Sequence, residues 1–213
     1  MSIAALAVDP QKGFTPLCPN ELPVPEGDKI VDELNHMFTL ADHKVASKDW
    51  HPENALWIAN EAAPQLSELN LPDADLYWNR HCIGGTFGAE FLDGLMKPEE
   101  FDFVVYKGME PHLHPYGACY HGLANKKSTG LIEWLKCRDV RMVLVGGLAY
   151  EFCVKQTALE LRDAGFDVLL YEPAVRGIFP DLIESAKKEM LSAGVSIVKG
   201  NVTLKTLKIP GLI

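Results

Sequence analysis

Long apolar runs are missing from this sequence. None approaches the roughly 20 residues that a membrane-spanning helix needs. The first run, Ile3–Val8, stops at Asp9 and has no basic residues before it, unlike a signal peptide. We therefore expect a cytoplasmic protein that has no membrane partner.

An excess of positive charge is missing as well. The chain has 20 Lys and Arg residues against 29 Asp and Glu residues, which gives a formal net charge of −9. An acidic chain is poorly suited to the phosphate backbone of nucleic acids and to anionic lipid surfaces. We therefore expect no nucleic-acid partner, and the charge leaves the class of small-molecule ligand open.

Paired cysteines and phosphate-binding glycine loops are also absent. The 5 cysteines form no CxxC pair and are odd in number, which is typical of thiols in a reducing compartment rather than of disulfides. Neither GxxxxGK[ST] nor GxGxxG occurs, so the common loops for nucleotide phosphates are excluded.

Short apolar runs alternate with amphipathic segments along the chain. The runs are nearly continuous in apolar residues, as in strands that helices cover on both faces. The alternation predicts an α/β fold with an open, mainly parallel six-stranded sheet and helices on both faces. The expected strands are Ile3–Val8, His43–Ser47, Phe101–Tyr106, Arg141–Val145, Asp167–Tyr171 and Val195–Val198, and the expected helices are Asp28–Leu40, Ser128–Lys136, Phe152–Ala164 and Leu182–Ala193.

The chain length and the lack of repeats or linkers favour one domain over residues 1–213. Two stretches, 10–27 and 52–87, are rich in Pro and Asn and do not fit the alternation of strands and helices. Loops of this length in a compact domain are more often functional than idle. We expect both loops to surround an active site.

Charged and nucleophilic side chains follow four of the predicted strands. In open α/β sheets, ligands bind beyond the carboxyl ends of the strands. A carboxylate, a carboxylate–imidazole pair, an ammonium and a thiol are therefore expected to meet at one edge of the sheet. In chain order these are Asp9, Asp49 with His51, Lys107, and Cys153.

Cys153 is the candidate nucleophile at this edge. It begins an expected helix after a glycine turn, where the helix N-terminus lowers the pKa of a thiol and free backbone N–H groups can hold an oxyanion. Lys107 would favour the thiolate further, and Asp9 would take its proton. Each residue also has an alternative role without catalysis. Cys153 would be a buried core thiol, Asp9 would cap the next turn, and Lys107 would be a solvated surface lysine.

Asp49 and His51 form a candidate metal site. Residues two apart in an extended segment point to the same side, and carboxylate and imidazole are common ligands of divalent ions. His81, in the second long loop, is the predicted third ligand. Zinc is the simplest ion for this set, and Fe²⁺ and Mn²⁺ stay open.

Other readings of the same residues stay open. Cys82 is a competing zinc ligand, although a residue next to His81 usually points away from the same ion. His112 and His114 repeat the spacing of two and form a weaker alternative pair. Each histidine also has a purely structural, hydrogen-bonded alternative.

Several segments around these residues resemble the isochorismatase-like cysteine hydrolases and, within them, the nicotinamidase branch. The similarity spans roughly residues 3–200, and this family has a Rossmann-like, three-layer α/β fold. The segments that carry it are AVDPQKGF, SKDWHP, WNRHCIGGTFGAEF, YKG and GGLAYEFCVKQTALE.

The resemblance assigns roles to individual residues. It implies a cis peptide bond between Leu148 and Ala149, with an oxyanion hole made by the N–H groups of Ala149 and Cys153. The implied catalytic triad is Asp9, Lys107 and Cys153, the implied metal ligands are Asp49, His51 and His81, and the implied pocket walls are Phe14, Trp78 and Leu148.

The activity that the resemblance implies is hydrolysis of nicotinamide, or a related aromatic amide, through a thioester. The metal separates this branch from metal-free relatives that act on isochorismate or on ureido and carbamoyl compounds, which remain the alternative. A non-catalytic binding protein on the same fold is a further alternative. The oligomeric state is open, and a homo-oligomer is compatible with the sequence.

The chain departs from the family pattern in places. Some relatives supply a fourth metal ligand, His or Glu, a few residues after His51. Trp57 and Asn60 occupy those regions here, so we expect water at that position. After YKG the chain has MEPHLHPYGACYHG in place of a stretch rich in Ser, Tyr and Phe.

Overall fold

The computed structural model describes residues 2–124 and 126–200. A six-stranded sheet forms its centre, in the order β5-β2-β1-β6-β7-β8, and every neighbouring pair is parallel. The prediction of an open, mainly parallel sheet is confirmed. The strands are β1 (Ser2–Val8), β2 (His43–Asp49), β5 (Phe103–Lys107), β6 (Val140–Leu148), β7 (Asp167–Arg176) and β8 (Ser196–Val198).

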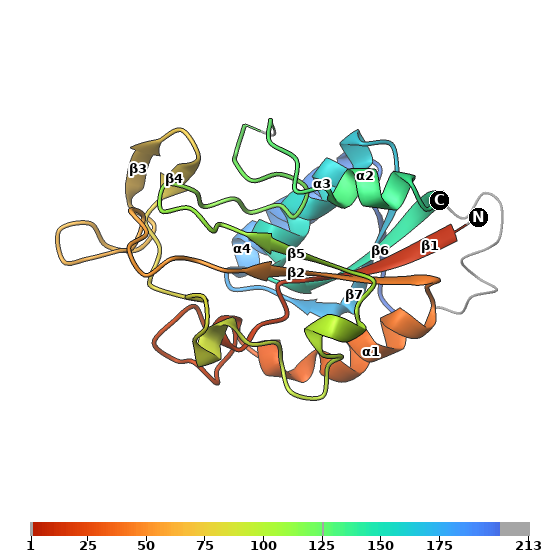
Figure 1. Cartoon of the computed structure of the whole chain (residues 1–213), viewed down its shortest axis with the longest axis horizontal. Coiled ribbons are helices and arrows are strands. Elements are labelled where there is room, and N and C mark those ends of the chain that lie inside the picture. The colour runs from red at the N-terminus through yellow and green to blue at the C-terminus, as the bar shows by residue number, and fades with distance from the viewer. Residues whose placement is uncertain (1, 125, 201–213) are drawn as a thin grey trace.

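Helices cover both faces of the sheet, as predicted (Figure 1). On one face Leu34 and Met37 pack with Ile3 and other sheet residues in one core cluster, and the remaining helices pack in a second cluster on the opposite face. No helix in the described part of the chain is long and apolar enough to cross a membrane. The helices are α1 (Val31–Thr39) on the first face, and α2 (Leu131–Lys136), α3 (Lys155–Asp163) and α4 (Pro180–Ser192) on the second.

The helix that was expected over Phe152–Ala164 is divided in two. Tyr150–Val154 forms a single π-helical turn, and α3 begins only at Lys155. Cys153 therefore lies in the π turn and not in the first turn of α3. Such turns are rare in proteins and occur frequently at functional sites.

The second long loop contains a small sheet that the sequence pattern did not predict. Strands β3 (Glu68–Leu71) and β4 (Ala74–Leu76) pair in antiparallel fashion. They are too short for an alternating pattern to stand out. In Figure 1 this hairpin and both long loops lie at the end of the sheet opposite the N-terminus, which is where the carboxyl ends of the strands meet.

Single-domain organisation over 1–213 stays a prediction, because residues 1, 125 and 201–213 lie outside the described residues.

The strands β1, β2, β5 and β6 all end at one edge of the sheet. Across that edge, Asp49 is the direct partner of Lys107, and Val8 is the direct partner of Gly147.

Gly147 lets β6 approach β1 closely at this edge. Its φ of +127° lies in a region that residues with a side chain rarely adopt, and a Cβ atom there would overlap the carbonyl oxygen of Val8. Strain and overlap each cost about 1–3 kcal/mol. Gly147 is therefore a structural requirement for the close pairing of β1 and β6, the strands that precede Asp9 and Cys153.

Gly147→Ala is expected to lower the free energy of unfolding by at least about 3 kcal/mol. Gly165→Ala is the matched control, since Gly165 has a φ of +92° but no atom within 4 Å of the added Cβ. That variant should lose only about 1 kcal/mol. Chemical denaturation measures both values, and equal losses would show that the contact with Val8 is unimportant.

Candidate active site

Asp9 directly follows β1 and is a fully buried carboxylate. Its φ of 45° lies in the left-handed region, an uncommon conformation for Asp that turns the chain away from the strand. Ser47, on the neighbouring strand, holds it twice. The Asp9 N–H donates to Ser47 Oγ at 3.2 Å, and the Ser47 hydroxyl donates to Asp9 Oδ1 at 2.7 Å.

Lys107 ends β5 and lies at the centre of the site, without solvent exposure. Its Nζ is 3.0 Å from Asp9 Oδ2 and 2.5 Å from Asp49 Oδ1. The same ammonium donates to the Pro115 carbonyl at 3.2 Å and lies 3.7 Å from Cys153 Sγ. The structure thus brings together all three residues of the predicted triad, with Asp49 as a fourth member.

The two carboxylates share one ammonium, and their pKa values move in opposite directions. Burial raises the pKa of Asp9 against the opposing charge of Lys107, and Asp49 adds to the rise. Burial acts likewise on Asp49, but Lys107, His51 and His81 together lower its pKa below the usual value. Asp49 is therefore the permanently ionised partner, and Asp9 is the carboxylate that takes up a proton more readily.

Burial opposes the thiolate that was expected at Cys153. The residue is only 6% exposed. Burial raises the pKa of this thiol well above its usual value, because desolvation outweighs the charge of Lys107. The sequence pattern placed Cys153 at a helix N-terminus, which would lower the pKa of a thiol. The residue lies instead in a buried π turn, where desolvation has the larger effect on its pKa.

The peptide bond between Leu148 and Ala149 is cis, as the resemblance implies. Ala149 follows β6 directly and lines a small pocket together with Cys153. Leu148 is fully buried in the core and is not among the residues that line this pocket, so its expected place in the pocket wall is taken by Ala149.

Asp49, His51 and His81 converge on the other side of the site. Asp49 Oδ2 lies 3.4 Å from His51 Nε2 and 4.0 Å from His81 Nε2. The other ring nitrogen of each histidine, Nδ1, is within hydrogen-bonding distance of a backbone carbonyl. Nδ1 of His51 lies 3.0 Å from Gly108 O. Nδ1 of His81 lies 2.6 Å from Asn79 O. Such contacts fix the tautomer and aim Nε2 at a metal ion.

These donors fit a divalent metal ion. His51 Nε2 is buried and has no hydrogen-bond partner among the described residues. Burial lowers the pKa of His81 to about 3, with the charge of His51 as a second cause, so its imidazole is neutral as a ligand must be. One carboxylate oxygen and two imidazole nitrogens suit Zn²⁺ or Fe²⁺.

Asp9, Asp49 and Cys153 form another group of potential ligands. One carboxylate oxygen of each Asp and the Cys153 sulfur all lie within 4.8 Å of one another. Lys107 Nζ contacts all three. Because an ammonium already supplies the positive charge there, this group is the predicted triad rather than a cation site. Cys82 belongs to neither group, and its Sγ faces the Gly88 carbonyl at 3.6 Å.

Two residues that sequence reasoning missed hold the ligands in place. Gln11 clamps the backbone of Asp49: its Nε2 donates to Asp49 O at 2.7 Å, and its Oε1 accepts from Asp49 N at 2.7 Å. Glu21 accepts a hydrogen bond from the N–H of Cys82, next to His81, at 2.8 Å. The burial of Gln11 is the signal, since a buried amide must find partners.

The pair His112 and His114 is divided between two environments. His112 is on the surface, with a side chain that is 55% exposed and 3.5 Å from Glu110. His114 is buried, and it can offer a ligand atom together with His51 and His81. The weaker alternative, in which His112 and His114 act together as one pair, does not match these two environments.

A pocket of about 20 Å³ opens between the triad and the histidines. Phe14 and Trp78 line it, as the resemblance implies, together with His114, Tyr116 and Phe152. The volume is that of one or two water molecules. A ring-bearing substrate does not fit this volume unless some of the lining residues shift.

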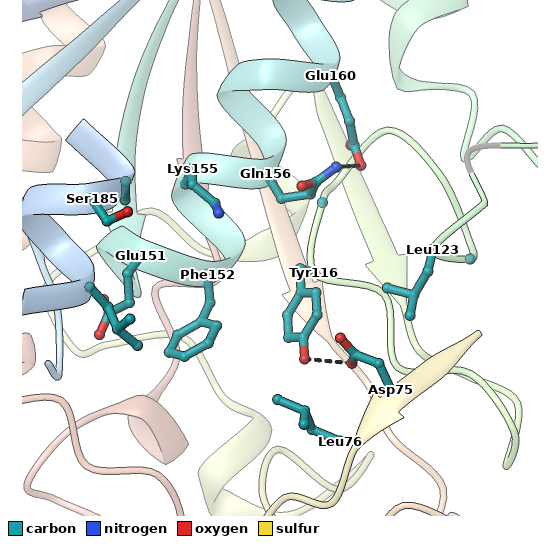
Figure 2. A pocket seen from close by; sticks show the side chains of 14 residues that line it. Asp75, Leu76, Tyr116, Leu123, Glu151, Phe152, Lys155, Gln156, Glu160 and Ser185 are labelled. Atoms are coloured by element: carbon teal, nitrogen blue, oxygen red, sulfur yellow. Dashed lines mark hydrogen bonds between the residues drawn. The ribbon is translucent and has the colours of Figure 1, made fainter. Parts of the chain in front are cut away.

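A larger cavity of about 420 Å³ lies outside this pocket, and Tyr116 and Phe152 line both (Figure 2). Tyr116 points toward Asp75 on β4 and donates its hydroxyl hydrogen bond to Asp75 Oδ1 at 2.8 Å. Trp78 Nε1 in turn donates to the Tyr116 oxygen at 3.3 Å. The hairpin of the second long loop thereby holds one wall of the inner pocket.

The chain is similar to several known proteins. The isochorismatase domain matches residues 4–201. A nicotinamidase of Acinetobacter baylyi is 33% identical over 196 residues, which cover 90% of each chain. A solved nicotinamidase and pyrazinamidase of Acinetobacter baumanii is 32% identical, with a TM-score of 0.85 over 97% of this chain and 98% of that one.

A pyrazinamidase of Pyrococcus horikoshii, solved in complex with zinc, is 35% identical. Its TM-score is 0.75, and the match covers 94% of this chain and all 100% of that one. The family match extends over far more than half of the sequence. The resemblance found in the sequence motifs is confirmed, and this chain belongs to the isochorismatase family.

Proposed function

We propose that this protein hydrolyses nicotinamide, or a closely related aromatic amide, to the carboxylic acid and ammonia. The observation that carries the proposal is the Lys107 ammonium in contact with Asp9, Asp49 and Cys153, beside a small aromatic pocket. The names of the similar proteins support the choice of substrate. The buried imidazoles beside the triad favour nicotinamide over the substrates of metal-free relatives.

The raised pKa values set the first step. Cys153 is a neutral thiol at rest, so its proton leaves as the sulfur attacks the carboxamide carbon, and Asp9 takes it. Lys107 stabilises the sulfur charge as it forms. The backbone N–H groups of Ala149 and Cys153 are proposed to hold the oxyanion, and each such donor contributes about 3–4 kcal/mol in the transition state.

The remaining steps return the enzyme to its starting state. Protonated Asp9 gives its proton to the amide nitrogen, the C–N bond breaks, and ammonia leaves a thioester on Cys153. Asp9 then takes a proton from water as the water oxygen attacks the thioester carbon. The C–S bond breaks, the carboxylic acid leaves, and Asp9 passes the proton that it took from water to the Cys153 sulfur.

Asp49, His51 and His81 are proposed to hold a divalent metal ion. When bound, the ion supplies a Lewis-acid contact for the ring nitrogen and so positions the substrate. Zinc in the similar Pyrococcus horikoshii structure supports Zn²⁺, while the donor set also suits Fe²⁺ and Mn²⁺. Phe14 and Trp78 are proposed to hold the ring from its sides.

We also propose a reducing compartment such as the cytoplasm as the place of action. All five cysteines are free thiols, and oxidation of the nucleophile would abolish the proposed reaction. The small-molecule substrate is the only partner that the proposal requires.

Cys153→Ala is expected to reduce kcat for ammonia release from nicotinamide by more than about 1,000-fold, because no nucleophile remains. Cys119→Ala is the control, since Cys119 is another buried thiol whose pKa is raised by burial but which lies outside the site. A coupled ammonia assay and circular dichroism measure turnover and folding. Substantial turnover by folded Cys153→Ala would overturn the proposal.

Limiting iodoacetamide is expected to label Cys137 before Cys153, with activity retained. Cys137 is exposed, whereas Cys153 is buried and neutral at rest. Peptide mass mapping measures the order of labelling. In Cys137→Ala, loss of activity should follow slow labelling of Cys153, and immediate labelling of Cys153 in the wild type would show that a thiolate is present at rest.

His51→Ala is expected to release the metal, raise KM and lower kcat for nicotinamide, because the ring is no longer held in attack geometry. Benzamide lacks the ring nitrogen and should be a poor substrate for both enzymes. Its kcat/KM should therefore fall much less than that of nicotinamide in this variant. Equal proportional losses for the two amides would mean that the ion does not grip the ring nitrogen.

A further inference from the structure

His114 is a buried imidazole with no hydrogen bond at either ring nitrogen among the described residues. Leaving such a group without a partner costs about 1–3 kcal/mol, and native structures rarely do so without a reason. The triad mechanism gives this residue no role. The free nitrogens therefore indicate a ligand that the protein chain itself does not supply.

Backbone contacts fix the position of His114. Its own N–H donates to the Asp73 carbonyl at 2.8 Å. The carbonyl before it, of Leu113, accepts from Trp57 Nε1 at 2.9 Å, and the carbonyl after it, of Pro115, accepts from Lys107 Nζ at 3.2 Å. Three successive residues are thus tied to three different parts of the site, so the ring is presented in a defined place.

The ring of His114 lies against the predicted metal ligands. It stacks on His51 with centroids 5.3 Å apart and an angle of 18°, and it meets His81 edge-on at 5.5 Å. Trp78 stacks on its other face at 5.7 Å. One potential ligand atom from each of the three histidines lies within 4.8 Å of the others. Two nitrogens bound to one ion at about 2.1 Å stand at most about 4.2 Å apart, so a small inward shift completes the set.

Trp57 lies where the family pattern led us to expect water in place of a fourth ligand. Its side chain is fully buried, and its ring packs against His51 at 4.5 Å and His114 at 4.5 Å. An indole offers no lone pair for a metal. Its bulk fills the space beside both imidazoles, whereas His114 has donor atoms without partners among the described residues.

We propose that His114 is a fourth protein ligand of the metal ion, beside Asp49, His51 and His81. The inference rests on the proposed function for the presence of the ion, but it concerns the number of imidazoles that bind it. The site then has three imidazoles and one carboxylate. The alternative role, a hydrogen bond from His114 to the substrate in the pocket that it lines, gives different results in the tests below.

X-ray absorption spectroscopy of the wild-type protein loaded with Zn²⁺ tests the proposal without any substitution. Three imidazoles should be counted around the zinc. Two imidazoles, or no bound zinc at all, would overturn it. Ammonia release from nicotinamide, measured on the same sample, tests the proposed function separately, because turnover with a two-imidazole site would leave that function standing and this inference refuted.

His114→Phe tests the same point through affinity, because phenylalanine keeps a ring between His51 and Trp78 but has no donor atom. Zinc affinity, measured by competition with a chromophoric chelator, should fall at least about tenfold, as it does when even an outer partner of a ligand is lost. His112→Phe is the matched control, two residues away on the surface, and should bind zinc as tightly as the wild type.

If His114→Phe does not fold, His114→Gln serves as a second variant. If neither variant folds, the number of imidazoles around zinc in the wild-type protein decides whether His114 is a ligand. Zinc affinity that is unchanged in a folded His114 variant, with only KM for nicotinamide raised, would assign His114 to the substrate and refute the metal role.

Discussion

The buried ammonium of Lys107 is the interaction on which the rest of the site depends. It has no solvent contact, and it lies between two carboxylates that are equally buried. An isolated charge in such a place would be very costly, so each of these three groups requires the others. Asp49 takes the ammonium most closely and stays ionised, and its charge helps to raise the pKa of Asp9. Asp49, the proposed metal ligand, thereby adds to the effect of burial on the pKa of Asp9, the proposed base.

The same burial explains why the nucleophile is held as a thiol. Desolvation raises the pKa of Cys153 more than Lys107 lowers it, so little thiolate exists before substrate arrives. A base of raised pKa next to a neutral thiol suits a concerted transfer, in which the proton moves as the sulfur attacks. Cys153 is only 6% exposed and the pocket beside it has a volume of about 20 Å³, so few water or oxidant molecules reach the sulfur at one time. Low reactivity at rest and high reactivity with the amide in place are thus two results of one desolvated environment.

The positions of the triad and of Asp49 were predictable because parallel strands end at one edge, and the apolar runs mark those ends. The His51 position followed from spacing, and His81 from the kind of residue expected beside a carboxylate–imidazole pair. Burial was not predictable from local sequence, so the rise that it causes in the pKa of Cys153 was not anticipated. The hairpin Glu68–Leu76 was missed because its strands are too short to show a period. The separation of His114 from His112 depends on contacts with Asp73 and Trp57, which lie far away along the chain.

The segment from Lys107 to Tyr116 shows how one loop can join the parts of this site. Lys107 is the centre of the triad, and the carbonyl of Gly108 holds the ring of His51. A side chain at Gly108 would overlap that ring, so the close approach requires glycine. The carbonyl of Pro115 returns to Lys107, and Tyr116 forms a pocket wall that Asp75 holds from outside. Because this is also where the sequence departs from the family pattern, we expect differences in pocket shape between this chain and its relatives to arise here. The proposed base Asp9 and nucleophile Cys153 lie outside this segment, after β1 and after β6.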